Sequence, residues 1–183
     1  MKVTDLPLEG LKLVENQVFR DERGFFIERF NSAAFEKAGL PCHFVQDNHS
    51  LSRPGVLRGL HFQFDPPQGK FVGVIRGRIW DVVVDLRPFS KSYGRHFGIE
   101  LSAENGSFLW VPAGFAHGFC VLGDEPADVL YKVDALYNAK GEAGIVWNDP
   151  DFNIPWPVKK PVVSERDGAL PTFRDIEKKM LIR

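Results

Sequence analysis

The chain consists mainly of short apolar segments that are separated by glycine, proline, asparagine and aspartate. These segments are rich in valine, isoleucine, phenylalanine and tryptophan, the residues that fit best on the pleated surface of a sheet. Many short strands with few helices indicate an all-β sandwich or barrel. The predicted strands are Leu11–Phe19, Gly24–Asn31, Val45–Ser52, Gly55–Gln63, Lys70–Arg78, Ile79–Leu86, His96–Leu101, Ser107–Val111, His117–Leu122, Val129–Leu136 and Ile145–Trp147.

Two short helices and one tight turn are expected beside these strands. Ser32 can cap a helix over Ala33–Ala38, because its hydroxyl can accept a free N–H of the first turn. Thr172 can cap a helix over Phe173–Leu181 near the end of the chain in the same way. Gly77 lies between two predicted strands, a position that suggests a tight hairpin.

Length and charge limit the possible classes of protein. With 183 residues and 44% hydrophobic content, the chain can bury one full core, so residues 1–183 are expected to form a single domain. The 23 basic and 24 acidic residues leave a formal net charge of −1, so no general attraction to nucleic acid or to an anionic membrane is expected. No segment approaches the roughly 18 apolar residues of a membrane span, and a cytoplasmic location is expected.

Four side chains are assigned no chemistry. Cys42 and Cys120 lack the spacing of a metal or redox motif and are expected to be buried free thiols. Asp81 and Asp85 alternate along one predicted strand and are expected to be structural or solvated.

The segment Gly55–Gln63 places an arginine and a histidine three residues apart in an apolar run. Histidine exchanges protons near neutral pH, and the planar guanidinium of arginine pairs well with phosphate or carboxylate. His61 and Arg58 therefore suggest a base beside an anion-binding group. Taken alone, however, the segment favours the alternative of a hydrogen-bonded core histidine beside an arginine with a buried stem.

A second segment, Gly106–Gly118, resembles the second motif of the cupin superfamily, G-x5-P-x-G-x2-H-x3-N. Pro112 and Gly114 would turn the chain between two strands, and the ring of His117 would then point into a barrel. Only the last motif position differs, because Val121 replaces asparagine. The match favours a cupin-type barrel.

The first cupin motif, G-x5-H-x-H-x3,4-E-x6-G, is matched by Gly55 and His61 but lacks the other metal ligands. Gln63 stands where the second histidine belongs, and Lys70 stands where the glutamate belongs. A metal site needs neutral imidazoles and carboxylates, whereas an ammonium group repels the ion. No metal site is predicted, and the remaining groups suit an anionic substrate and a developing enolate.

Further motifs extend over nearly the whole chain. They are DERGFF and IERF within 21–30, FVQDNHS at 44–50, VLRGLHFQ at 56–63, DVVVDLR at 81–87, LSAEN at 101–105, VPAGFAHGF at 111–119, YK at 131–132, GIVWNDP at 144–150 and S-x-R-D-x-x-x-P at 164–171. Together they resemble the dTDP-4-dehydrorhamnose 3,5-epimerase family. The resemblance implies a cupin-type jelly roll with short peripheral helices, a homodimer and no cofactor. The implied reaction converts the dTDP-4-keto-6-deoxy sugar dTDP-4-dehydro-6-deoxy-D-glucose into dTDP-4-dehydro-L-rhamnose, within dTDP-L-rhamnose biosynthesis.

The resemblance implies a role for each of five side chains. His61 is the expected base, and Asp167 is expected to hold its ring and stabilise its charged form. Lys70 would face the developing oxyanion, Tyr131 would return a proton from the other side, and His117 would lie near the sugar or the diphosphate. The protons at C3 and C5 of a 4-keto sugar are acidified by the carbonyl between them, so a base and an oxyanion site suffice without hydride transfer or metal.

Other positions are expected, by the same resemblance, to bind the substrate. Arg23 and Arg58 are the expected diphosphate contacts, because guanidinium groups pair with phosphate in a bidentate manner. Tyr137 is expected to stack on thymine, with a half-buried strand tyrosine as the structural alternative. In a dimer, Arg23 and Glu28 would reach across to the other subunit. The full set is Arg23, Glu28, Gln46, Asp47, Asn48, Arg58, Lys70, His117, Tyr137, Glu142 and Arg166.

Three alternative functions are compatible with the same fold. A relative could epimerise only C3 or only C5, it could bind a sugar nucleotide without catalysis, or it could be a metal-dependent dioxygenase. The joint presence of His61, Tyr131 and Asp167 argues against a binding module. The broken ligand set argues against the dioxygenase.

Overall fold

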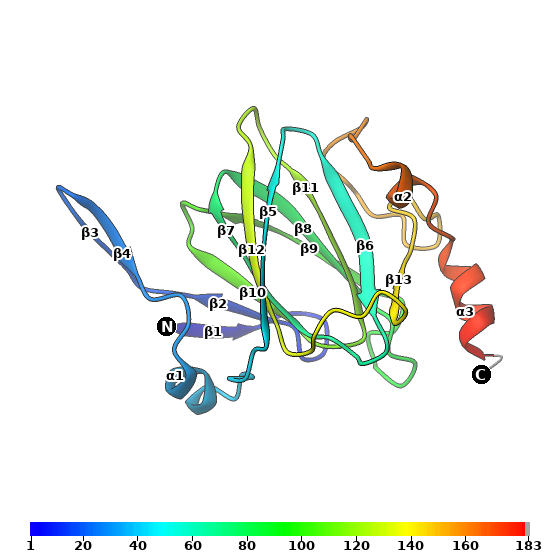
Figure 1. The fold of residues 1–183 in the computed structure, drawn as a ribbon, viewed down its shortest axis with the longest axis horizontal. Coiled ribbons are helices and arrows are strands. Elements are labelled where there is room, and N and C mark those ends of the chain that lie inside the picture. Colours follow the sequence, from blue (N-terminus) through cyan, green and yellow to red (C-terminus); the bar gives the residue numbers. More distant parts are fainter. Residues whose placement is uncertain (182–183) are drawn as a thin grey trace.

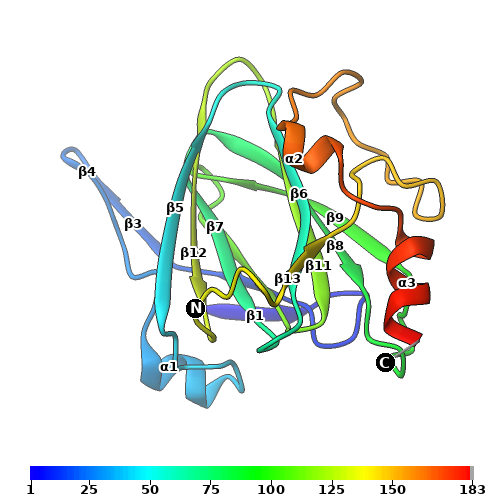
Figure 2. The same ribbon diagram turned by 45° about the vertical axis from the view of Figure 1, so that its right-hand side comes forward.

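The computed structural model of the chain describes residues 1–181, whose strands form two large antiparallel sheets (Figure 1, Figure 2). The strand orders are β1-β2-β10-β7-β12-β5 in the six-stranded sheet and β13-β6-β11-β8-β9 in the five-stranded sheet. The first sheet contains β1 (Lys2–Asp5), β2 (Lys12–Glu15), β10 (Ser107–Val111), β7 (Lys70–Arg76), β12 (Ala127–Val133) and β5 (Gln46–Ser52). The second contains β13 (Glu142–Gly144), β6 (Leu57–Gln63), β11 (Phe115–Val121), β8 (Arg78–Asp85) and β9 (His96–Ser102). The sheets lie face to face as separate layers, and the predicted all-β jelly roll is confirmed.

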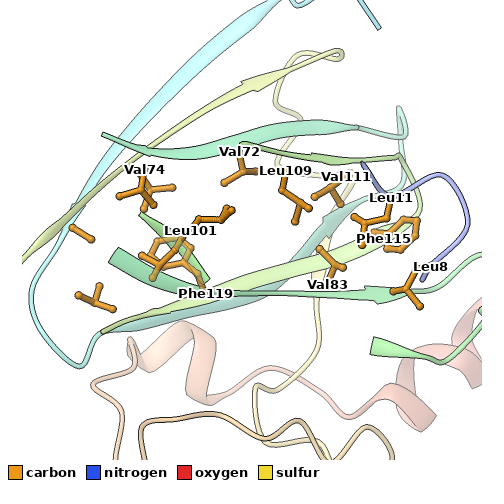
Figure 3. Packing of buried hydrophobic residues seen from close by; sticks show 14 residues of the cluster. Leu8, Leu11, Val72, Val74, Val83, Leu101, Leu109, Val111, Phe115 and Phe119 are labelled. Atoms are coloured by element: carbon orange, nitrogen blue, oxygen red, sulfur yellow. The ribbon is translucent and has the colours of Figure 1, made fainter. Parts of the chain in front are cut away.

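The main core lies between the two sheets (Figure 3). Val72 and Leu109 of the six-stranded sheet face Val83 and Phe119 of the five-stranded sheet. Successive side chains of a strand point to opposite faces, so the neighbouring Phe71 packs on the outer side, against a cluster that includes a side chain of helix α1 (Ser32–Lys37). This alternation decides which polar side chains face the space between the sheets.

The predicted hairpin at Gly77 is wrong. β7 pairs with β10 and β12, whereas β8 pairs with β9 and β11, so the two strands belong to different sheets. Gly77 has a φ of +73°, and a Cβ atom there would collide with the carbonyl oxygen of Pro126. Glycine therefore permits the corner that carries the chain from one sheet to the other.

Strand predictions were least accurate near the ends of the chain. The segment predicted as Leu11–Phe19 is divided between β2 and β3 (Val18–Asp21). β3 pairs with β4 (Gly24–Ile27) in a separate two-stranded sheet, which projects from the body as an arm (Figure 1). Ile145–Trp147 is not a strand, and β13 precedes it. β1 was not predicted, because its side chains are mostly exposed and carry no apolar pattern.

Both cysteines are free thiols. Cys120 is buried as predicted, whereas Cys42 is exposed, so the prediction that Cys42 is buried is wrong.

The helices agree with the predictions except at one cap and in one short segment. α1 is capped by Asn31, whose side chain accepts a backbone N–H of the first turn at 3.1 Å, so the prediction of Ser32 as the cap is wrong. α3 spans Phe173–Leu181 as predicted, and Thr172 Oγ1 accepts a first-turn N–H at 3.4 Å. A further short helix, α2 (Glu165–Gly168), was not predicted from the sequence. Among the described residues, no helix has the length and apolar character needed to cross a membrane.

Candidate active site

A cavity of about 390 Å³ lies between the sheets and takes residues from both. It brings together ten of the residues proposed from the sequence: Gln46, Asn48, Arg58, His61, Lys70, His117, Tyr131, Tyr137, Glu142 and Arg166. Strand alternation explains this convergence on β5, where Gln46, Asn48 and Ser50 line the cavity. Ser50 was not proposed from the sequence, although its even spacing from the other two residues could have identified it.

Asp47 lies outside this cavity. Its side chain points to the opposite face of β5 from those of Gln46 and Asn48, and its carboxylate forms an ion pair with Lys132 Nζ at 2.9 Å. The Asp47 side chain is more than half exposed. The structure therefore does not bring Asp47 together with the other proposed residues.

His61 forms a close pair with Asp167, as the resemblance implied. His61 Nε2 lies 2.8 Å from Asp167 Oδ1, and the other carboxylate oxygen accepts the Gly59 N–H at 3.1 Å. Asp167 is buried in α2, where Ser164 Oγ accepts its backbone N–H. Figure 2 shows α2 beside β6, the strand of His61. The pairing leaves Nδ1 as the ring nitrogen available to take or give a proton.

His117 forms a second histidine–carboxylate pair. His117 is the antiparallel cross-strand partner of His61, and its Nε2 lies 2.8 Å from Asp81 Oδ2. Asp81 is fully buried, so it is not solvated, and burial raises the pKa of its carboxyl while His117 opposes that rise. Asp81 was not predicted as a site residue. Asp81 lies two residues before the core residue Val83 on the same strand, and this spacing could have placed it on the inner face of β8.

Two glycines allow β6 and β11 to approach each other beside the histidines. Gly59 has a φ of +110°, and a Cβ atom there would lie 2.7 Å from both Gly118 Cα and the His117 carbonyl oxygen. The strand register shifts between His117 and Phe119, next to this contact. A larger side chain at Gly59 would push the two histidine-bearing strands apart.

Lys70 supplies a buried cation to the cavity. Lys70 is 8% exposed, and among the groups that the structure describes its ammonium has no hydrogen-bond or ion-pair partner. Burial lowers its pKa to about 8, although the charges of Glu142 and Asp134 act in the opposite direction. An ammonium that is poorly solvated and unpaired interacts strongly with any negative charge that develops nearby.

Tyr131 supplies a phenol to the same cavity. It lies on β12, opposite Asn48 of β5 and Val72 of β7, and it packs partly against the main core. Burial raises the pKa of its hydroxyl, while the positive charge of Arg58 lowers it. The hydroxyl therefore stays protonated near neutral pH and can donate a proton.

Charged and aromatic groups gather at the mouth of the cavity. Glu142 accepts hydrogen bonds from the Tyr137 hydroxyl at 3.0 Å and from Arg166. Arg58 donates to Ser52 Oγ at 2.9 Å and to the Leu51 carbonyl oxygen at 3.3 Å. These contacts hold two guanidinium groups beside the cavity.

Arg23 and Glu28 lie apart from this cavity. Arg23 is at the tip of the β3–β4 arm, where its side chain is 83% exposed and bonds only its neighbour Asp21 among the described residues. Glu28 follows β4 and accepts a hydrogen bond from Asn31 at 3.3 Å. Neither residue lines the cavity of its own chain.

The cavity side chains do not fit the metal site of a cupin. Nε2 of each histidine is bonded to a carboxylate, and the side-chain amide of Gln63 is bonded to backbone groups. Lys70 would repel a cation. Within the part of the chain that the structure describes, no cluster of three or more histidine, cysteine, aspartate or glutamate side chains could hold a metal ion.

Proton transfer by side chains is the chemistry that such a cavity supports, which places the chain among cupin-type acid–base enzymes. The family model described as dTDP-4-dehydrorhamnose 3,5-epimerase matches residues 5–175. The chain belongs to this family, and the resemblance found in the sequence is confirmed.

Individual relatives agree with the family model. The dTDP-4-dehydrorhamnose 3,5-epimerase of Shigella flexneri is 50% identical over 179 residues, which cover 97% of this chain and 98% of that protein. The protein of the same name from Methanothermobacter thermautotrophicus is 51% identical over 171 residues, 92% of each chain. A solved structure of dTDP-6-deoxy-D-glucose-3,5-epimerase from Legionella pneumophila, in complex with dTDP-4-keto-L-rhamnose, is 40% identical with a TM-score of 0.93. It covers 98% of this chain and 96% of that one.

Proposed function

We propose that the chain inverts C3 and C5 of dTDP-4-dehydro-6-deoxy-D-glucose to give dTDP-4-dehydro-L-rhamnose, with residues 1–183 acting as one domain. The observation that carries the proposal is the 2.8 Å contact between His61 and Asp167 in a cavity that also holds Lys70 and Tyr131. The ligand of the Legionella relative supports the same class of substrate.

In the proposed reaction, His61 removes the proton from C3 or C5, and the electrons of the broken C–H bond form an enolate with the C4 carbonyl. Asp167 stabilises the imidazolium, because an adjacent carboxylate favours the charged ring. Lys70 stabilises the enolate oxygen, and Tyr131 protonates the carbon from the opposite face. The tyrosinate then recovers a proton from solvent and His61 releases one, so protons balance over the cycle.

The nucleotide is proposed to lie across the mouth of the cavity. Arg58 supplies a guanidinium group for the diphosphate, and Arg166 with Glu142 closes the site over it. Tyr137 is 55% exposed at the mouth of the cavity, so its ring is available to stack on the base. Asn48 is proposed to contact the substrate from β5.

Replacing Tyr131 with phenylalanine tests both the function and the direction of proton delivery. In D2O, the unmodified protein is expected to give product with deuterium at C3 and C5. Tyr131→Phe is expected to exchange substrate protons at these carbons while product formation falls by about 10²-fold or more, because the base can still return a solvent-derived deuteron to the original face. Mass spectrometry and NMR of the sugar measure both results.

The other outcomes of this experiment contradict specific parts of the proposal. Deuterium at only one carbon in the unmodified reaction would identify a single-position epimerase, and binding without exchange would identify a non-catalytic module. Loss of all exchange in Tyr131→Phe, with dTDP still bound, would show that Tyr131 does more than deliver the second proton.

We further propose that two copies form a homodimer through the β3–β4 arm. Phe19, Phe25 and Phe26 of this arm are 52%, 55% and 67% exposed. A two-stranded hairpin is marginally stable alone, and exposed apolar patches favour protein contacts. In the proposed dimer, each arm packs on the other subunit and brings Arg23 and Glu28 to that subunit's cavity.

Subunit complementation is the expected consequence of this exchange. Arg23→Ala and His61→Ala chains should each be nearly inactive alone, but their mixed dimer contains one site with both residues intact. Co-expression in equal amounts should restore about a quarter of the normal activity, since half of the dimers are mixed and half of their sites are intact. Absence of restored activity in a mixed dimer isolated with two different tags would contradict the exchange.

A further inference from the structure

The segment that carries Tyr137 is held by side chains rather than by strand pairing. β12 ends at Val133 and β13 begins at Glu142, and residues 134–141 between them belong to no strand. Figure 1 shows this segment as a loop that runs between the two sheets. Because its backbone groups lack a neighbouring strand, their hydrogen bonds must come from elsewhere.

Gln63 provides two of these hydrogen bonds and a third to the adjacent loop. The residue is 3% exposed, and its Nε2 donates to the carbonyl oxygens of Leu136 at 3.0 Å and Pro66 at 2.9 Å. Its Oε1 accepts the Asn138 N–H at 2.8 Å. One side-chain amide is thus hydrogen-bonded to the backbone on both sides of Tyr137 and to the backbone of the adjacent loop.

Gln68 makes a further hydrogen bond to this segment, closer to the end of β12. It is 8% exposed, and its Nε2 donates to the Ala135 carbonyl oxygen at 2.8 Å. The next residue, Gly69, donates its N–H to Asp134 Oδ1 at 2.7 Å. We call Gln63 and Gln68 the glutamine brace, since both hold the backbone of the Tyr137 segment.

The hydrogen bonds of Gln63 leave it no donor for a ligand, although the residue lines the cavity. A glutamine amide has two N–H donors, and both donors of Gln63 are used by backbone carbonyl groups. Its side chain therefore has no donor left for a sugar or phosphate oxygen. The position at which a metal-binding cupin has its second histidine is committed to holding a loop.

We propose that the glutamine brace consists of positioning residues that hold Tyr137 ready for the nucleotide base before the ligand binds. A loop that is already ordered loses less conformational freedom on binding, so the brace increases affinity for the base-bearing part of the substrate. The inference rests on the proposed stacking of Tyr137. It assigns the brace no contact with the diphosphate.

The test compares a ligand with a base and a ligand without one. Calorimetry should show that Gln63→Met weakens dTDP binding by about tenfold, because two carbonyl groups and one N–H lose their partners and the loop is released. Gln68→Met, which breaks one contact, should give a smaller loss in the same direction. Binding of inorganic pyrophosphate should be unchanged in both variants. Gln17→Met, at an exposed glutamine outside the cavity, is the matched control.

A double-mutant cycle with Tyr137→Ala separates positioning from general damage. If the brace acts through Tyr137, Gln63→Met should weaken dTDP binding little further in a chain that already carries Tyr137→Ala. The proposal would be overturned if the fold-losses in dTDP affinity of the two single variants multiplied in the double variant. It would also be overturned by an equal loss of pyrophosphate binding, or by unchanged dTDP binding in both brace variants. If Gln63→Met does not fold, the cycle is run with Gln68→Met.

Amide hydrogen exchange distinguishes failure of the brace from failure of the proposed stacking. Both brace variants should exchange faster at residues 135–138 in the absence of ligand, whereas Tyr137→Ala should not. Unchanged dTDP affinity in Tyr137→Ala, together with faster exchange in Gln63→Met, would overturn the stacking of Tyr137 but retain the bracing of the loop. Unchanged exchange in the brace variants would overturn the brace itself.

Discussion

His61→Ala is expected to lower kcat by about 10²- to 10⁴-fold, the usual contribution of a positioned general base. The variant removes the imidazole that Asp167 holds at 2.8 Å, while Arg58, Tyr137 and the rest of the nucleotide site keep their places. The dTDP dissociation constant should therefore change little, because the lost interaction belongs to the transition state. Turnover is measured by coupled assay, and dTDP affinity by calorimetry.

His49→Ala is the matched control for this variant. His49 also pairs with a carboxylate, at 2.9 Å from Asp128, but its side chain is 52% exposed and it does not line the cavity. The control should keep normal turnover. Near-normal turnover in His61→Ala, or a fall in His49→Ala of the same size, would contradict the assignment of His61 as the base.

Lys70→Met is expected to lower kcat/KM by about 10²- to 10³-fold, as does the loss of an oxyanion-stabilising group in other enzymes. Methionine has a similar length and no charge, so it removes the buried ammonium without leaving a polar group unpaired. The fold should therefore persist, and the loss should appear in kcat/KM rather than in thermal stability.

The pH dependence provides a second signature of Lys70. Burial lowers its pKa to about 8, so the fraction of charged ammonium falls as the pH rises through that value. The free enzyme should lose kcat/KM on the alkaline side of about pH 8, since kcat/KM reports the ionisation of free enzyme. The raised pKa of Tyr131 places its ionisation above its ordinary value of 10, outside this transition.

The test measures kcat/KM between about pH 6 and pH 10 in the unmodified protein, in Lys70→Met and in the control Lys132→Met. The alkaline decrease should be present in the unmodified protein and in Lys132→Met, whose lysine pairs with Asp47 outside the cavity. It should be absent from the residual activity of Lys70→Met. An alkaline decrease that survives in Lys70→Met would assign this transition to another group.

How much of the fold the sequence could predict depends on how far apart along the chain the residues lie that determine each feature. Alternation of apolar residues acts over a few positions, and it located the central strands, as with Ser107–Val111, whose predicted bounds agree with those of β10. The partner of each strand depends on contacts far along the chain. Gly77 shows the difference, because a glycine between two strand patterns correctly indicated a change of direction, while the pairing of the flanking strands was predicted wrongly.

The site shows the same division. Spacing within the two motifs selected His61 and His117, and their cross-strand pairing brings them side by side. The hydrogen bond between His61 and Asp167 joins residues 106 positions apart. It was predicted only from the family resemblance, since no local sequence pattern encodes it. The bond from His117 to Asp81 spans 36 residues and was missed, because an acid on a strand cannot be distinguished from a solvated one until the covering sheet is known.

The sequence by itself determined an all-β fold, the family, and the presence of His61 and Lys70 at two positions where the cupin motif has metal ligands. Each of these depends on residue type and short spacing. Only the tertiary structure decided that Asp47 faces away from the cavity, that Asp81 supports His117, and that Gln63 holds a loop. The physical reason is that side-chain direction, burial and hydrogen-bond partners are set by how two sheets pack together, a property of the whole chain.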